Sequence, residues 1–369
     1  MTVSEILRQE WFKAPGERTF SPLKPFLALL SYLYACGLKI KQRPAVTLKG
    51  KSLPGFVLSL GNLTVGGTGK TPAAKMLAEW AGSRGYEVAI LSRGYGGHHG
   101  GRGILEVSGK DRLHAGPQEA GDEPYLLARN LKGVPVIVAK NRRLAGLYAH
   151  RRYRSNFYIL DDGFQHLALR RDLDLVLIDA SNPFGNGRLL PWGPLREPLR
   201  HLQRADGFIM THAGERSEDE ALDDYLKKRL HEKPFYRSDH IPDRIILPSQ
   251  NKAAAPDLLR GKRIAAFAGI AQPEKFRKTL IDLGAEPVYF RNFRDHHPYS
   301  NRELQGLIER MKGLEAEYLV TTEKDWVRLE GFANANTQLV YLTVKLSLLD
   351  REKDFYQMIE NRVEQAGHG

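Results

Sequence analysis

The chain has 369 residues, 42% of them hydrophobic and 27% charged, which is enough for two domains with separate cores. Lys and Arg number 55 against 43 Asp and Glu, and the net charge of +12 suits an anionic partner: nucleic acid, anionic lipid or a phosphorylated substrate. The single cysteine, Cys36, excludes an internal disulfide and a cysteine-based zinc site, and it agrees with a reducing cytoplasm.

Near the N-terminus lies an apolar, aromatic-rich run, Pro25–Leu38, followed by the cations Lys39, Lys41 and Arg43. At about 14 residues, the run is shorter than the ~20 that a membrane-spanning helix needs. A helix of this kind fits the membrane interface, with its cations at the lipid headgroups. Because the run is apolar nearly all round, we favour this interpretation over a helix packed on the protein's own core.

A phosphate-binding loop is the central motif. Phe56–Leu60 predicts a buried strand, a glycine-rich turn follows, and a helix opens at Thr71. The pattern G-x-x-x-x-G-K-[ST] is met, except that Thr64 stands at the first glycine. We expect Lys70 to reach the β- and γ-phosphates and Thr71 to hold Mg²⁺; the alternative is an ordinary turn before a helix with an exposed lysine. The predicted nucleotide-binding residues are Thr64, Val65, Gly66, Gly67, Thr68, Gly69, Lys70 and Thr71.

Two loops that follow could face the nucleotide. A second short strand, Glu87–Leu91, ends in Ser92–Gly97, a glycine-rich loop with a cation and an aromatic ring. Loops at strand ends beside a P-loop commonly face the ligand, although a plain turn would have the same composition. Gly121–Pro124 then opens a helix. Its acids, Asp122 and Glu123, either cap the positive helix end or face the phosphates as a base or a metal-shell group.

Further buried strands are predicted at 134–138, 156–160, 175–179 and 207–211. The strand at 156–160 closes on Asp161 and Asp162, which is how a second Mg²⁺-binding element delivers carboxylates beside a P-loop threonine; a strand-end turn is the alternative. His166 follows closely, and a lone histidine is usually structural. The segment 182–198 is too rich in Gly and Pro for regular structure, and so long a loop is usually functional.

A second α/β unit follows a stretch in which the pattern loosens. Strands are predicted at 263–270, 286–290, 318–321 and 339–344, and between them Asp295 stands beside His296. Thr321–Asp325 is another polar strand end. The predicted division is an N-terminal helical segment at 1–45, a P-loop core domain at 46–235, a linker at 236–260 and a C-terminal α/β lobe at 261–369.

Taken together, these motifs resemble the tetraacyldisaccharide 4′-kinase family, the lipid A 4′-kinases of Gram-negative bacteria. They occur in the family's order from about residue 20 to 350, and Thr64 in the P-loop looks like the family's own variant. The stretches that carry the resemblance are Gly61–Pro72, Ser92–Gly97, Gly121–Pro124, Asp161–His166, Phe184–Gly187, Gly193–Pro198, Phe267–Ile270, Asp295–His296 and Thr321–Asp325.

The resemblance implies a P-loop kinase with a mostly parallel sheet flanked by helices, a second, smaller α/β lobe and an N-terminal apolar helix. It implies transfer of the γ-phosphate of ATP, with Mg²⁺, to the 4′-hydroxyl of tetraacyldisaccharide 1-phosphate, an acylated glucosamine disaccharide, to form lipid IVA. The enzyme would be a monomer on the cytoplasmic face of the bacterial inner membrane, where its apolar helix and basic surplus meet anionic lipid.

The family also implies roles for individual residues. Asp122 would be the base for the sugar hydroxyl, paired with His296, and Lys70 would act with them in catalysis. We prefer His296 to His297 because the family pattern is Asp followed by one His. The remaining roles are metal binding by Thr71, Glu123, Asp161 and Asp162, and lining of the site by Arg93, Tyr95, His166, Arg196 and Glu197.

Two other classes remain open at this point. One is a P-loop regulatory ATPase or GTPase with its basic face on membrane or nucleic acid, although the guanine-selecting N-K-x-D is missing from the sequence. The other is a soluble P-loop ligase or kinase for a small acid, of the dethiobiotin-synthetase type, which would not need the run Pro25–Leu38. We expect no nucleic-acid partner, because neither an aromatic-plus-basic repeat nor a known reader motif is present.

Overall fold

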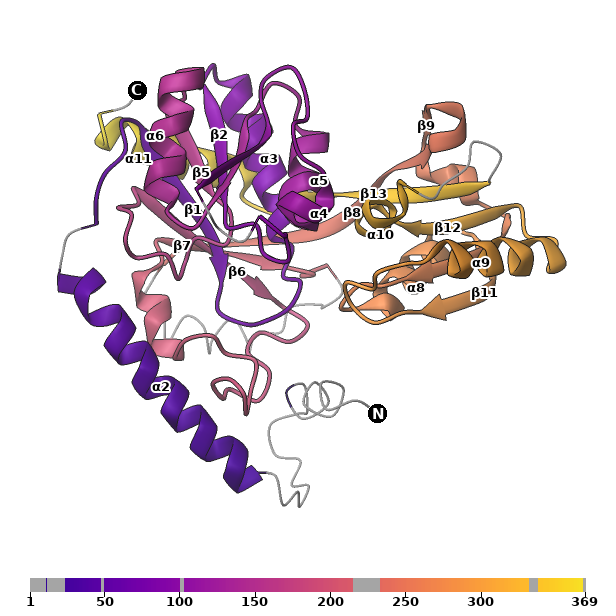
Figure 1. The fold of residues 1–369 in the computed structure, drawn as a ribbon, viewed down its shortest axis with the longest axis horizontal. Coiled ribbons are helices and arrows are strands. Elements are labelled where there is room, and N and C mark those ends of the chain that lie inside the picture. The colour runs from indigo at the N-terminus through magenta and orange to yellow at the C-terminus, as the bar shows by residue number, and fades with distance from the viewer. Residues whose placement is uncertain are drawn as a thin grey trace.

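A computed structural model describes residues 11, 24–47, 50–99, 103–214, 233–331 and 338–367. Most of the predicted N-terminal segment before Lys24 therefore lies outside the described residues. Within the described ranges, the chain forms one sheet of 13 strands in the order β11-β10-β12-β13-β8-β7-β6-β1-β5-β2-β4-β3, with β9 paired to β8. Helices flank the sheet, as the sequence predicts (Figure 1).

The strands are β1 (Phe56–Asn62), β2 (Val88–Ser92), β3 (Ile104–Ser108), β4 (Val136–Ala139), β5 (Phe157–Leu160), β6 (Leu173–Asp179), β7 (Gly207–Thr211), β8 (Phe235–Leu247), β9 (Lys252–Ala254), β10 (Arg263–Ala268), β11 (Glu286–Asn292), β12 (Tyr318–Thr322) and β13 (Leu339–Leu348). The α-helices are α2 (Lys24–Thr47), α3 (Lys70–Ser83), α4 (Pro117–Ala120), α5 (Asp122–Asn130), α6 (Arg142–Tyr153), α8 (Pro273–Asp282), α9 (Asn301–Gly313), α10 (Glu323–Leu329) and α11 (Glu352–Gln365). Short 3₁₀ turns are η1 (Leu199–Arg204), η2 (Pro248–Gln250) and η3 (Pro256–Leu259). We call β1–β7 with α3–α6 and α11 the N-terminal lobe, and β9–β12 with α8–α10 the C-terminal lobe.

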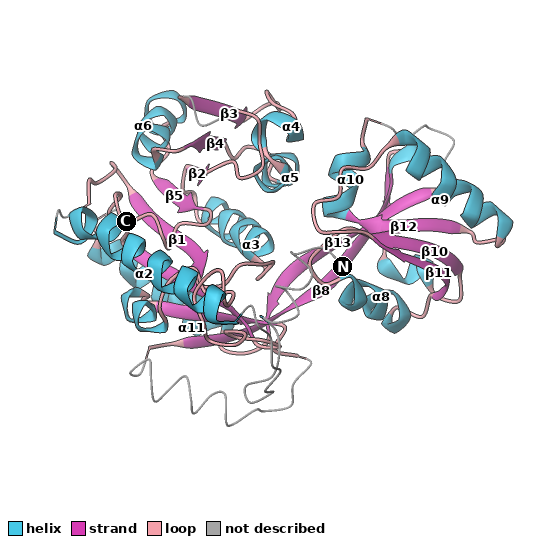
Figure 2. Cartoon of the chain, turned by 60° about the horizontal axis from the view of Figure 1, so that its bottom comes forward, coloured by secondary structure: helices cyan, strands magenta, loops and turns pink. Residues whose placement is uncertain are grey.

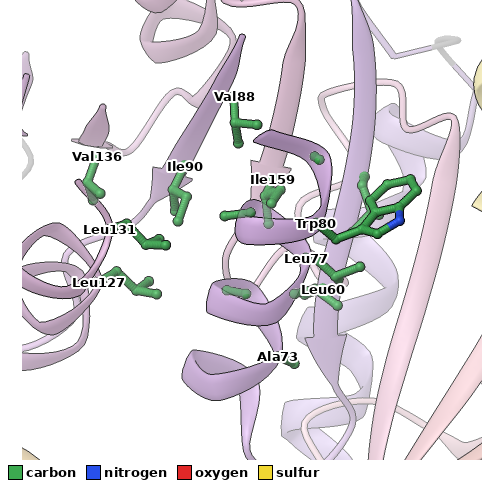
Figure 3. Packing of buried hydrophobic residues seen from close by; sticks show 14 of the residues in the cluster. Leu60, Ala73, Leu77, Trp80, Val88, Ile90, Leu127, Leu131, Val136 and Ile159 are labelled. Carbon is green, nitrogen blue, oxygen red and sulfur yellow. The ribbon is translucent and has the colours of Figure 1, made fainter. Parts of the chain in front are cut away.

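The N-terminal lobe is built on parallel strands, with only β3 antiparallel at its edge. All seven residues of β1 are buried, as expected for a parallel strand covered on both faces. Leu60 packs with Leu77 and Trp80 of α3 on one face (Figure 3), where α5 and α11 also lie. Val57 packs with α6 on the other face. The C-terminal ends of the parallel strands β1, β2 and β5 therefore lie together at one end of the sheet, next to the start of α3.

The C-terminal lobe repeats this arrangement on a smaller scale. Its strands β11, β10 and β12 are parallel to one another and to β13, which lies beside β12 and pairs antiparallel with β8. Strands β8 and β13 connect the two lobes. Phe267 packs with helices α9 and α10 on one face of the sheet, and Ile264 packs with α8 on the other. Alternate residues of β10 thus serve two separate cores, which is the period-2 pattern of a strand buried on both sides.

The two lobes are joined by strands rather than by irregular chain. The stretch 236–260, expected to be a loose linker, contains the long strand β8, which pairs with β7 at Phe235 and with β13 at His240. The pairing register between β8 and β13 shifts next to Pro242. Proline cannot donate a hydrogen bond within a sheet, so it is found in strands mainly at such irregularities. Figure 2 shows β8 and β13 running together between the lobes.

Helix α2 is longer than the predicted run at 25–38 and lies along the outside of the N-terminal lobe (Figure 1). Among the described residues, no helix is long and apolar enough to cross a membrane. Several large apolar side chains of α2 are exposed to solvent: Phe26, Leu29, Tyr32, Leu33 and Ile40.

Candidate active site

The P-loop joins β1 to α3, and Thr71 stands in the first turn of that helix. Gly69 has φ 81°, and a Cβ at this position would lie 2.6 Å from the ring of His240. Asn62, at the end of β1, donates from Nδ2 to the carbonyl of Thr64 at 2.8 Å and accepts from Lys70 Nζ at 3.0 Å. The lysine is therefore held back over the loop, at the end where a phosphate would bind.

Asp162 lies between two cations. Its carboxylate is 3.4 Å from Lys70 Nζ, and Arg196 Nη1 donates to both of its oxygens at 2.8 and 2.9 Å. Burial alone would raise the pKa of Asp162, but these two charges outweigh burial and hold the pKa at about 2. Asp162 is therefore ionised at neutral pH.

Asp161 lies in the opposite electrostatic environment. Only 3% exposed, it accepts a hydrogen bond from Ser92 Oγ, at the end of β2, at 2.9 Å. Burial, and then the nearby Glu123 and Asp162 carboxylates, raise the pKa of Asp161 to about 6. A carboxylate crowded in this way is relieved by a bound cation.

Arg142, which the sequence analysis did not select, is buried near the same acids. It begins α6, just after β4, and its Nε has no hydrogen-bond partner among the described residues. Burial, followed by the charge of Arg93, lowers the pKa of Arg142 to about 10, while Asp161 and Asp162 oppose this shift. In the sequence, Arg142 resembles several predicted site residues in one respect only: it follows a buried strand.

The Gly/Pro-rich loop at 182–198 packs directly against the P-loop. Val65 N donates to the carbonyl of Pro194, and Arg196 N donates to that of Leu63, both at 2.8 Å. These bonds bring the Arg196 side chain to Asp162. Glu197, in contrast, is 1% exposed, and its Oε2 accepts from His201 Nδ1 at 2.8 Å and from Arg204 Nη2 at 2.6 Å. Its carboxylate therefore stabilises the loop from within.

The other predicted lining residues lie on neighbouring turns. The loop after β2 places Arg93 and Tyr95 at the surface, and the Tyr95 side chain is 82% exposed. The Tyr95 carbonyl lies so close to Gly121 (φ 89°) that a Cβ there would be 2.4 Å from it, which explains why glycine precedes the two acids. His166 lies on the turn after Asp162, where its backbone N–H donates to Gly163 O at 2.8 Å.

Asp122 begins α5 in the N-terminal lobe and meets the C-terminal lobe. Its Oδ2 is 3.0 Å from His296 Nδ1 and accepts from Arg328 Nε at 2.7 Å. Burial alone would raise the pKa of Asp122, but the His296 hydrogen bond and the Arg328 charge hold it below its ordinary value. An ionised carboxylate at this place can accept a proton. The predicted pairing of Asp122 with His296 is thus present as a direct contact.

Both ring nitrogens of His296 have charged neighbours. Its Nε2 lies 3.4 Å from Lys324 Nζ, and its Nδ1 lies 3.0 Å from Asp122 Oδ2 and 3.2 Å from Arg328 Nη2. Lys324 also donates to Glu123 Oε1 at 3.2 Å. Neighbouring His297 instead contacts Glu303 at 3.0 Å, so His296 is the histidine that faces the two acids.

These residues fit ATP with Mg²⁺. Glycine amides at a helix N-terminus and Lys70 match a phosphate chain, and the crowded Asp161 matches a cation. The described residues contain no group of three His, Cys, Asp or Glu side chains arranged to bind a metal. Mg²⁺ binds proteins through one or two carboxylates and completes its shell with phosphate oxygens and water, and Asp161 and Asp162 are carboxylates that could serve in this way.

Comparisons with known proteins give the same result. The family model described as tetraacyldisaccharide-1-P 4'-kinase matches residues 23–364. A tetraacyldisaccharide 4'-kinase from Syntrophus aciditrophicus (strain SB) is 38% identical over 97% of this chain and 98% of its own length. One from Syntrophobacter fumaroxidans is 40% identical over 89% of this chain and 86% of its own.

A solved structure is similar over nearly the whole fold. The crystal structure of LpxK from Aquifex aeolicus in complex with ATP superposes with a TM-score of 0.71 at 33% identity, covering 92% of this chain and 98% of that one. The P-loop, the strand-end acids and these matches lead to one conclusion: the chain belongs to the tetraacyldisaccharide-1-P 4'-kinase family.

Proposed function

We propose that this kinase transfers the γ-phosphate of ATP to the 4′-hydroxyl of tetraacyldisaccharide 1-phosphate, to form lipid IVA. The observation that carries the proposal is the meeting of two sets of groups. Lys70 and Asp162 form one set at the P-loop, and Glu123 is near enough for its charge to act on Asp161 and for the Lys70 charge to act on it. Asp122, the residue before Glu123, is held by His296 from the other lobe. Phosphoryl transfer needs mainly positioning and charge stabilisation, and this arrangement supplies both.

We assign the following roles to the residues of the site. Lys70 and the loop amides hold the β- and γ-phosphates, Thr71 with Asp161 and Asp162 provides oxygen ligands for Mg²⁺, and Glu123 serves the same metal. When bound, Mg²⁺ neutralises charge on the phosphate oxygens. Arg196 keeps Asp162 ionised and in place.

Asp122 acts as the base in this proposal. As the sugar oxygen forms its bond to the γ-phosphorus and the bond to the ADP oxygen breaks, the hydroxyl proton passes to the Asp122 carboxylate. His296 Nδ1 lies 3.0 Å from that carboxylate and, with the ring proton on Nδ1, orients it. A carboxylate is a weak base at pH 7, so its placement, rather than its basicity, has to supply the advantage.

Helix α2 supports work at a membrane surface. Its exposed residues Phe26, Leu29 and Leu33 recur at helical spacing on one stripe. Two hydrogen bonds join α2 to the Gly/Pro-rich loop at 182–198, which packs against the P-loop. Ser31 Oγ donates to Leu189 O and Tyr34 OH donates to Arg196 O, both at 3.0 Å. An interfacial helix anchored in this way would present the site to an acylated substrate on the inner membrane's cytoplasmic face.

ATP consumption with the disaccharide 1-phosphate lipid in mixed micelles tests the function. We expect consumption to depend on the lipid and Lys70→Ala to lower kcat by ~10²–10³-fold, as for loss of one preorganised charge-stabilising donor. Lys75→Ala, on the same helix and paired with Glu79 at 3.9 Å, is the matched control and should retain activity.

Two results would contradict the proposal: ATP consumption that is the same without the lipid, or a Lys70→Ala enzyme as fast as the Lys75→Ala control. Sedimentation with anionic liposomes separates the membrane part. If the wild type and a Leu29→Asp/Leu33→Asp variant both stay in the supernatant, the interfacial role of α2 is wrong, while the kinase assignment stands.

A further inference from the structure

A buried carboxylate in the C-terminal lobe forms a fixed point behind the site. Asp325, in the first turn of α10, is 0% exposed. Its Oδ1 accepts from Tyr299 OH at 2.9 Å and Arg328 Nη1 at 3.0 Å, and its Oδ2 accepts from Gly269 N at 3.0 Å and Thr322 Oγ1 at 2.7 Å. A buried charge satisfied on both oxygens holds its neighbours in one geometry.

Arg328 extends from this fixed point to the other lobe. Its side chain is 8% exposed, and its Nη1 also donates to Gly269 O at 3.2 Å. Its Nε donates to Asp122 Oδ2 at 2.7 Å. One planar guanidinium thus joins a carboxylate locked in the C-terminal lobe to a carboxylate at the start of α5 in the N-terminal lobe, which a lysine could not do.

The contacts leave one oxygen of Asp122 available. Arg328 Nε and His296 Nδ1 both lie on Oδ2. Within the described part of the chain, no hydrogen bond reaches Oδ1. Arg328 Nη2 also lies 3.2 Å from His296 Nδ1, so the guanidinium contacts both members of the pair. Its Nε–H donates to Oδ2, which fixes the plane of the carboxylate and turns Oδ1 towards the space in front of α5.

We propose that Arg328, anchored by Asp325, is a positioning residue that aims Asp122 Oδ1 at the substrate hydroxyl. The inference rests on the proposed role of Asp122 as base. It gives the C-terminal lobe a defined task, since the base is aligned only while α10 is docked on α5. It also gives a role to the motif Thr321–Asp325, which the function described so far does not use.

A purely structural role for Arg328 in lobe docking is the competing explanation. Helix α5 also contacts Glu330, the residue that follows α10: Arg129 Nη1 lies 3.1 Å from Glu330 Oε1, and Tyr125 OH donates to Glu330 Oε2 at 3.0 Å. Neither contact involves Asp122. Arg129→Ala therefore removes a comparable cross-lobe pair and is the matched control for Arg328→Ala.

The test begins with steady-state kinetics on lipid micelles. We expect Arg328→Ala to lower kcat by ~10–100-fold with the KM for ATP unchanged, because a misaligned base impairs chemistry rather than nucleotide binding. Added guanidinium should restore part of the lost rate, and Arg328→Lys should not. Asp325→Asn, which retains Arg328 but weakens its anchor, should lower kcat in the same direction and by less. Thermal unfolding with and without ATP checks that each variant is folded.

A double-mutant cycle with Asp122→Asn gives the decisive result. If Arg328 acts through Asp122, Arg328→Ala adds no further loss in the Asp122→Asn background. Losses that multiply, or an Arg129→Ala control that loses as much kcat as Arg328→Ala, would overturn the inference while the kinase assignment stands. An Asp122→Asn enzyme with wild-type kcat would instead contradict the proposed base itself.

Discussion

The charged groups contributed by the two lobes reach the active site in different ways. In the N-terminal lobe, Lys70, Asp161 and Asp162 come from the ends of neighbouring parallel strands and the helix between them. Their positions are set by one sheet edge. In the C-terminal lobe, His296 and Arg328 come from a loop and a helix that reach Asp122 only because the lobes are docked.

The difference teaches where each part of the mechanism is vulnerable. Strand-end groups are held by a continuous buried sheet, so nucleotide binding should survive changes in the C-terminal lobe. The base and its partners cross the boundary between lobes, so catalysis should be sensitive to the same changes. Nucleotide binding and chemistry should therefore respond separately to mutation.

The largest expected effect is at the boundary. Asp122→Asn should lower kcat by ~10²–10⁴-fold, the range that a general base contributes, because the amide cannot accept the hydroxyl proton. ATP should still bind, since Lys70 and the loop glycines are untouched. Single-turnover rates and ATP titration would measure the two quantities separately. If ATP binding falls as far as kcat, the two lobes do not divide these tasks.

The next largest effect is on the unfolding free energy and its dependence on pH, and it comes from Asp161 at the end of β5. The folded-state pKa of Asp161 is raised to about 6 from an ordinary 3.8. Between these values the unfolded chain releases this proton while the folded protein keeps it, so the contribution to stability is present below about pH 4 and lost as the pH rises through 6. Asp161→Asn should therefore stabilise the nucleotide-free protein at pH 8, by about 1–3 kcal/mol, and much less at pH 4.5.

Denaturant unfolding at the two pH values measures this difference. Asp111→Asn, an exposed carboxylate of the same lobe, is the control and should change little at either pH. The Asp161→Asn protein should also lose the extra stabilisation that Mg²⁺ adds to ATP in the wild type. An unfolding free energy that is unchanged at pH 8 would mean that Asp161 carries no electrostatic strain.

The contrast between the lobes also explains what the sequence could predict. Apolar runs such as Phe56–Leu60 and Val134–Val138 predicted their strands, because a parallel strand buried on both faces is apolar throughout. Strands β3 and β8 were missed, because both are only partly buried and β8 contains Pro242. In these strands, pairing with neighbours decides the structure rather than the local pattern.

The same reasoning applies to the site residues. Lys70, Asp161 and Asp162 follow recognisable strand and loop patterns, and the structure brings them together. Arg328 and Lys324 belong to helix α10. From the sequence, Thr321–Asp325 is interpreted only as a polar strand end and as part of the family resemblance, and neither Lys324 nor Arg328 is given a role. Their contacts with Asp122 and Glu123 depend on how two lobes dock, and no local spacing encodes that arrangement.

The smallest expected effect tests the local geometry of the P-loop. Gly69 has φ 81°, and a Cβ there would also press on the ring of His240 at 2.6 Å. An alanine would disfavour this left-handed conformation by about 1–2 kcal/mol and move the loop away from it. Restoring the loop geometry when ATP binds should then weaken binding by ~10-fold. Isothermal titration with ATP and Mg²⁺ would measure it.

Gly82→Ala, near the end of the same helix, provides the contrast. Gly82 has open space around its Cβ position and no positive φ, so alanine should stabilise α3 slightly and leave ATP affinity unchanged. If Gly69→Ala binds ATP as tightly as the Gly82→Ala control, the loop can shift away from His240 at no cost. The N-terminal lobe would then be as adaptable as the boundary, and the division of tasks between a rigid nucleotide site and a docked base would have to be abandoned.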